Sequence, residues 1–138
     1  MYRLLTADHA YVGIWIEEHG GGPYRIGAKC IGLERNGEIV AATSYDNFNG
    51  ASIMASIAIV GPVTKSWLRS IFAYPFVQLE AKVILGAVAA TNYKSLRLVD
   101  HMGFMPVADI PDADPCGLLC LYAMHREECR YLKGTANE

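Results

Sequence analysis

The sequence has no surplus of positive charge. It contains 12 Lys and Arg residues against 14 Asp and Glu residues, which gives a formal net charge of −2 and a pI near 6.1. A protein that binds nucleic acid without sequence preference neutralises several phosphates with basic side chains. The charge balance therefore argues against nucleic acid as the main partner.

Long apolar runs are also missing. The N-terminal segment carries Asp8 where a secretory signal needs an apolar core, so we expect no signal peptide. The most apolar stretch runs from Ile53 to Pro62, which is too short to cross a bilayer, and it contains Ser56 and Gly61. We therefore expect a cytoplasmic protein without a membrane partner.

Cysteines are few and do not form close pairs. None of the four is part of a CxxC motif, whereas structural zinc sites usually contain two close ligand pairs. His125 and Cys129 are four residues apart and would supply only one such pair. We therefore predict reduced thiols and no metal site. The cysteines are Cys30, Cys116, Cys120 and Cys129.

Apolar residues make up 52% of the chain, enough for one domain over residues 1–138 to bury a core. We expect residues 126–138 to be a partly frayed tail. The positions of apolar residues, glycines and prolines predict the order β-α-βββ-α-β-α-ββ. Asn36 and Gly37 are a strong hairpin signal, and residues 111–115 form a turn-rich segment between the last two strands. The expected strands are 2–5, 29–34, 38–45, 51–60, 82–89, 104–107 and 117–125.

Three helices complete this order. We expect the glycine-rich stretch 19–23 after the first helix to be a mobile loop. Pro75 should kink or break the second helix, because proline lacks a backbone N–H, and Gly103 should end the third. The order indicates an α/β (α+β) fold with a mixed, mostly antiparallel central sheet and helices on both faces. The expected helices begin at Thr6 or Asp8, at Thr64 and at Asn92.

The third helix carries a recognisable motif. Residues 92–104 read Asn-Tyr-Lys-Ser-Leu-Arg-Leu-Val-Asp-His-Met-Gly-Phe. This segment resembles the Asn-x-x-Ser-x-Arg-…-Gly-Phe helix of the GNAT acetyltransferase superfamily, and it is similar in particular to the branch that acetylates N-termini of ribosomal proteins. The similarity covers about residues 55–125. Residues 67–79 are also similar to small phage and prophage GNAT-like proteins, which would place the chain in the cytosol of a bacterial host.

The resemblance implies a GNAT-like sheet and a site for acetyl-CoA, used as co-substrate without a metal. The family lays the pantetheine arm of acetyl-CoA along the strand before the first crossover helix, and the pyrophosphate meets the start of that helix. Asn92 can contact pantetheine or cap its own helix, and Ser95 can reach the same groove. The other implied cofactor-binding residues are Ile57, Ile59 and Val60 on the strand and Thr64, Lys65 and Ser66 at the helix start.

The sequence departs from the family at the phosphate end. The family loop reads Gln/Arg-x-x-Gly-x-Gly/Ala, because only glycine lets backbone amides come close to phosphates. Here Gly61 comes too early, and Trp67 places bulk where small residues are expected. Two interpretations remain open for Thr64, Lys65 and Ser66: they hold phosphate through hydroxyls and charge, or they form an ordinary capped helix start.

A second departure concerns catalysis. Many family members place a tyrosine seven residues after the motif asparagine as a proton donor, and this position is Val99 here. Ser95 is the substitute that the resemblance implies. We expect the general base at a strand end facing the groove. The candidates are Asp46 and Tyr45, which we favour as catalytic residues, and also Glu34 and Ser56.

These features lead to competing hypotheses about function. The first is an N-acetyltransferase that transfers acetyl from acetyl-CoA to an amine of a protein or small molecule. The second is a non-catalytic GNAT-fold phage protein, binding or virion-associated, that has lost cofactor binding. A third, an α/β module unrelated to GNAT proteins, requires a sheet whose strands stay paired after Val60. A homodimer is compatible with each.

Overall fold

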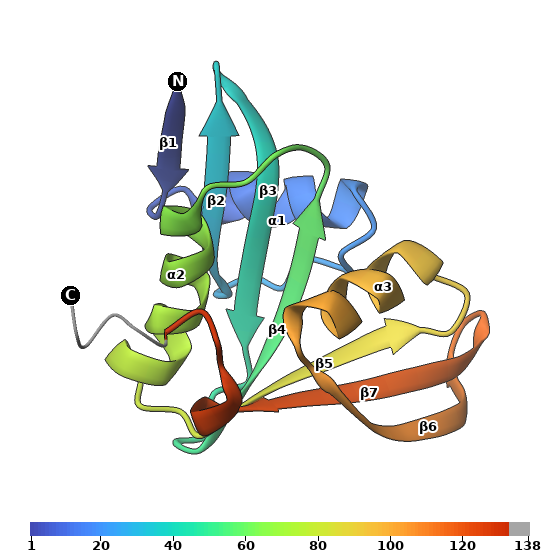
Figure 1. Cartoon of the computed structure of the whole chain (residues 1–138). Helices are drawn as coiled ribbons and strands as arrows, with labels where there is room; N and C mark the ends of the chain where they lie inside the picture. The colour runs from blue at the N-terminus through green and yellow to red at the C-terminus, as the bar shows by residue number, and fades with distance from the viewer. Residues whose placement is uncertain (133–138) are drawn as a thin grey trace.

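The structure, a computed structural model, describes residues 1–132 and is built on one seven-stranded sheet (Figure 1). The strand order is β1-β2-β3-β4-β5-β7-β6, and only β4 and β5 are parallel neighbours. The predicted α+β fold class and order of elements are confirmed. The strands are β1 (Tyr2–Leu5), β2 (Lys29–Arg35), β3 (Glu38–Asp46), β4 (Ser52–Ile59), β5 (Val83–Ala89), β6 (Met105–Asp114) and β7 (Gly117–His125).

Helices cover both faces of this sheet. Val12 and Ile16 of α1 are buried against Ala42 of β3 and Ala58 of β4, so α1 lies behind the sheet in Figure 1. The side chains of α2 and α3 belong to a second core cluster, which covers the opposite face. The helices are α1 (His9–Glu18), α2 (Lys65–Ala73) and α3 (Tyr93–Met102), with a π-helical turn (Tyr74–Gln78) and a 3-10 turn (Arg126–Glu128).

Local sequence signals set the ends of these elements. Asn36 and Gly37 connect β2 and β3 with φ angles of 52° and 88°, as a two-residue primed turn requires. The side chain of Thr64 accepts a hydrogen bond from the Trp67 N–H and so caps α2. The predicted break at Pro75 is confirmed, since α2 ends at Ala73 and the chain continues as the π-helical turn.

One expectation about the C-terminal part was wrong, because the strand predicted at 104–107 is longer. Strand β6 continues through the predicted turn at 111–115 as far as Asp114, because a register shift between Ile110 and Asp114 absorbs the extra residues opposite β7. Of the expected partly frayed tail, residues 126–132 are described, and there the ring of Tyr131 stacks on Phe72 with centroids 4.7 Å apart. The remainder of that tail, 133–138, lies outside the described residues.

The contact between α1 and the following loop generates a stability prediction. A Cβ at Gly13 would lie 2.1 Å from Cδ1 of Tyr24, whose ring covers this glycine. We expect Gly13→Ala to lower stability by about 1–3 kcal/mol through overpacking, which outweighs the gain in helix propensity of up to about 1 kcal/mol. Urea denaturation measures the change. In a Tyr24→Ala background the same substitution should be neutral or stabilising; equal destabilisation in both backgrounds would contradict the packing.

Candidate functional site

The two parallel strands separate in the middle of the sheet. Strands β4 and β5 pair at three positions, the last of which joins Met54 to Leu85. Beyond it, β4 stays paired with β3 and β5 stays paired with β7 to their ends. We call the opening between residues 55–59 and 86–89 the wedge (Figure 1). The expectation of an opening is confirmed, and the continuously paired sheet of the third hypothesis is contradicted.

The β4 side of the wedge presents unpaired backbone groups. The Val60 N–H donates to the Val40 carbonyl of β3 at 2.8 Å. Backbone groups alternate between the two sides of a strand, so the N–H and C=O groups of Ile57 and Ile59 point away from β3 into the wedge. Polar backbone groups inside a protein need a partner. This edge therefore offers donors and acceptors to water or to a ligand.

The β5 side matches it. The Ala90 N–H donates to the Leu118 carbonyl of β7 at 2.9 Å, so by the same alternation the backbone groups of Ala87 face β4. Gly86 lies at the narrow end, where a Cβ would be 3.8 Å from the Ala55 carbonyl oxygen and near no other atom beyond its chain neighbours. Space for a larger side chain therefore exists there.

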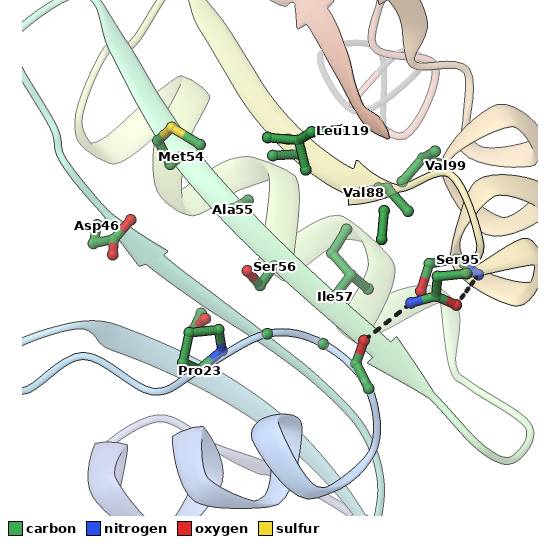
Figure 2. Close-up of a pocket in the computed structure, with 18 of the residues that line it drawn as sticks. Pro23, Asp46, Met54, Ala55, Ser56, Ile57, Val88, Ser95, Val99 and Leu119 are labelled. Carbon is green, nitrogen blue, oxygen red and sulfur yellow. Dashed lines mark hydrogen bonds between the residues drawn. The ribbon is translucent and has the colours of Figure 1, made fainter. Parts of the chain in front are cut away.

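A cavity of about 380 Å³ occupies the wedge and continues toward the loop after α1. Ile57, Val88 and Val99 form its apolar part, and Ser95 of α3 is the hydroxyl beside them (Figure 2). Glycines 20–22 of the predicted mobile loop line the opposite wall. The cavity thus combines apolar walls with a strand edge that can bind an amide-containing chain.

Asn92 connects the two sides of this cavity. Its side-chain oxygen accepts a hydrogen bond from the Ser95 N–H at 3.2 Å and caps α3, while its amide nitrogen donates to the Gly20 carbonyl at 3.3 Å (Figure 2). The helix-cap interpretation of Asn92 is confirmed. A contact between the Asn92 amide and a ligand would have to replace the bond to Gly20.

The charged residues of the cavity are mainly acidic. Asp46 at the end of β3 forms an ion pair with Arg25, with 3.3 Å between its Oδ2 and the arginine Nε. Asp114 lines the cavity from the β6–β7 hairpin. Among residues 1–132, Arg25 is the only lysine or arginine in the lining, so its charge is exceeded by those of the two carboxylates. The charged lining as a whole therefore suits a positively charged amine better than an anion.

The structure brings only part of the predicted site together. Of the ten residues that the sequence favours for the site, four line the cavity and six do not; Ser56, a further base candidate, also lines it. The residues in the lining are Asp46, Ile57, Asn92 and Ser95. Those outside it are Tyr45, Ile59, Val60, Thr64, Lys65 and Ser66.

Tyr45 and Asp46 point to opposite faces because they are adjacent in one strand. Tyr45 is only 3% exposed, and its hydroxyl donates to the Ile71 carbonyl of α2. Burial, with the neighbouring Tyr74 and Cys30, raises the pKa of Tyr45 well above its ordinary value. This tyrosine is therefore wrongly placed for a general base.

Several lining residues were missed by sequence reasoning. Gly86 carried a usable signal, because a glycine within a strand often marks a close backbone approach. Arg25 and Asp114 carried no such sequence signal, since Arg25 lies in a loop and Asp114 lies in a segment expected to be a turn. Their position depends on contacts between distant segments.

Two further features of the described residues bear on the sequence predictions. No helix within residues 1–132 has the length and apolar character needed to cross a membrane, and no group of three or more His, Cys, Asp or Glu side chains in this part could hold a metal ion. All four cysteines are free. Burial raises the pKa of the Cys30 thiol to about 11, which keeps it protonated.

No protein-family model matches this chain, and no curated protein has a matching sequence. Solved structures do match. A proposed acetyltransferase of Salmonella typhimurium, yncA, solved with its cofactor acetyl-CoA, is 15% identical with a TM-score of 0.66 over 90% of this chain and 93% of its own. Spermidine/spermine N-acetyltransferase SpeG of Vibrio cholerae is 13% identical with a TM-score of 0.70 over 96% and 98%.

A third structure, of another proposed acetyltransferase, is 18% identical with a TM-score of 0.62, and the match spans 75% of this chain and 64% of that one. At these identities the likeness establishes the fold, which is that of GNAT acetyltransferases. The closer resemblance to the ribosomal-protein branch and to phage proteins stays a prediction.

The two bonds of Asn92 can be separated by mutation. Asn92→Ala should cost about 1 kcal/mol of stability because it removes a helix cap. Asn92→Asp keeps the capping oxygen and removes only the donor to Gly20. We expect near wild-type stability for this variant and faster amide exchange at Gly21 and Gly22. Unchanged exchange in both variants would show that the Gly20 bond does not hold the loop.

Proposed function

We propose that this chain is an N-acetyltransferase that transfers an acetyl group from acetyl-CoA to an amine of a protein or small molecule. The observation that carries the proposal is the unpaired backbone edge at Ile57 and Ile59 in the middle of a GNAT-type sheet, where Ile57 lines an apolar cavity. An extended ligand with alternating amides can bind such an edge as an added strand. The pantetheine arm of acetyl-CoA is a ligand of this kind, and the acetyl-CoA complex of yncA supports the choice.

The reaction proposed is direct transfer. The amine nitrogen attacks the thioester carbon, the new C–N bond forms, and the C–S bond breaks to release the thiol. A free N–H of Ile57 or Ile59 would donate to the carbonyl oxygen as negative charge develops on it. Holding both reactants in one cavity supplies much of the rate gain.

Two side chains are assigned roles in proton transfer. Asp46 would attract the acceptor ammonium and take up its proton, directly or through water. Ser95, beside Val99 in the lining, would donate a proton to the departing thiolate. Tyr45 is left out of this scheme because it is buried on the other face.

A non-catalytic binding protein is the second candidate. It is favoured by the start of α2, which does not line the cavity, and by the Asn92 amide, which is bonded to Gly20. Such a protein keeps the sheet but binds no acetyl-CoA. Binding of the donor therefore separates the two candidates before any acceptor is known.

A graded pair of substitutions at Gly86 tests the site. By calorimetric titration we expect millimolar to sub-millimolar binding of acetyl-CoA to the wild type. Gly86→Ala should change Kd by less than about threefold, because its Cβ makes only an ordinary contact. Gly86→Leu fills the narrow end of the wedge and should weaken binding more than about tenfold.

Circular dichroism and thermal unfolding of both variants check that the sheet is intact. No binding to the wild type at millimolar acetyl-CoA would leave the non-catalytic candidate. Equal binding to wild type and to a folded Gly86→Leu variant would place the ligand outside the wedge and refute the proposed site.

A further inference from the structure

The start of α2 is held away from the wedge. Trp67, in the first turn, is fully buried, and its ring nitrogen donates to the Ile31 carbonyl of β2 at 3.4 Å. Strand β3 separates β2 from β4, so this bond anchors the first turn of α2 over the far side of the sheet (Figure 1). Thr64 also uses its hydroxyl within the helix, on the Trp67 N–H. The start of this helix, where an anion would bind, therefore lies over β2 and outside the lining of the cavity.

The loop that connects β4 to α2 also runs away from the wedge. After β4 the Val60 N–H bonds to Val40, and a Cβ at Gly61 would lie 3.2 Å from the Val40 Cβ. The chain thus leaves the wedge along β3 rather than across the wedge opening. The next residue, Pro62, has no N–H to offer a phosphate.

The charge of the cavity also argues against a phosphate site. Within the described part of the chain, its lining contains Arg25 as the one basic side chain, and Asp46 already pairs with it. Asp114 adds a second carboxylate. Phosphates are bound by free amides, lysines and arginines, and two carboxylates against one guanidinium oppose them.

The wedge nevertheless supplies what an amide chain needs. Ile57 and Ile59 on one edge and Ala87 on the other offer backbone donors and acceptors, and the walls beside them are apolar. The volume of about 380 Å³ is near the small end of the range for ligand pockets, about 300–1,000 Å³. It suits an acylated amide arm rather than a complete nucleotide-bearing donor.

We infer that this chain recognises its acyl donor through the acylated pantetheine arm alone, and that the nucleotide of CoA contributes little. The inference rests on the proposed function and narrows its donor to the class of pantetheine thioesters. An acyl-pantetheine without nucleotide then binds as well as acetyl-CoA.

The test compares three ligands by calorimetric titration on the full chain: acetyl-CoA, S-acetylpantetheine and 3′-phosphoadenosine 5′-diphosphate. We expect the Kd values of the two thioesters to differ by less than about tenfold. The nucleotide alone should neither bind at millimolar concentration nor displace S-acetylpantetheine. Gly86→Leu should weaken both thioesters equally, because they share the wedge.

A preference for acetyl-CoA above about tenfold, or competition by the nucleotide, would overturn the inference while leaving the transferase proposal in place. Lys65→Ala tests whether the start of α2 holds the phosphates. If it does, this variant binds acetyl-CoA more weakly, while its Kd for S-acetylpantetheine is unchanged. We expect the ratio of the two Kd values to stay the same. Failure of both thioesters to bind would refute the transferase proposal itself.

Discussion

The early end of the pairing between β4 and β5 is the constraint on which the site depends. Beyond the positions where they pair with each other, each strand keeps an antiparallel partner on its far side, β3 for β4 and β7 for β5. The two halves of the sheet can therefore diverge after three paired positions and leave only the inner edges unpaired. The cost is a row of backbone groups at Ile57, Ile59 and Ala87 without strand partners. A fold that keeps such an edge beside an apolar cavity is suited to bind an extended polar chain there.

The rest of the site is arranged around this opening. Helix α3 begins just past β5 and places Ser95 in the cavity, while the loop after α1 closes the other side. Asn92 joins these two segments, which are 72 residues apart in the sequence. The carboxylates of Asp46 and Asp114 make the charged lining of the cavity mainly acidic. The cavity thus combines apolar walls and polar strand edges with a lining whose charges are mainly acidic.

Local sequence patterns were enough to predict the order of elements and several of their ends. The turn at Asn36 and Gly37, the cap at Thr64 and the stop at Gly103 each depend on one or two neighbouring residues. Long-range contacts were not predictable in this way. The sequence could not show that Trp67 anchors α2 on Ile31, or that Tyr131 stacks on Phe72.

Within the site, too, some features follow from local sequence patterns and others depend on long-range contacts. Alternation along β3 could have excluded Tyr45 once Asp46 was assigned to the groove, because adjacent side chains take opposite faces. The backbone groups of Val60 could not be assigned without the register of β4 on β3, since that register decides which amides bond to β3 and which face the wedge. Whether Thr64, Lys65 and Ser66 can hold phosphate or only form a capped helix start depends on the path of a loop, which no local signal sets.

Amide hydrogen exchange along β4, followed by NMR, tests the central claim directly. If the wedge is open, the Ser56 and Ala58 amides, which bond to β3, exchange slowly, whereas those of Ile57 and Ile59 exchange fast and become protected when a pantetheine thioester is added. Equal slow exchange at all four positions without ligand would mean that the inner edge is paired, and it would contradict the account.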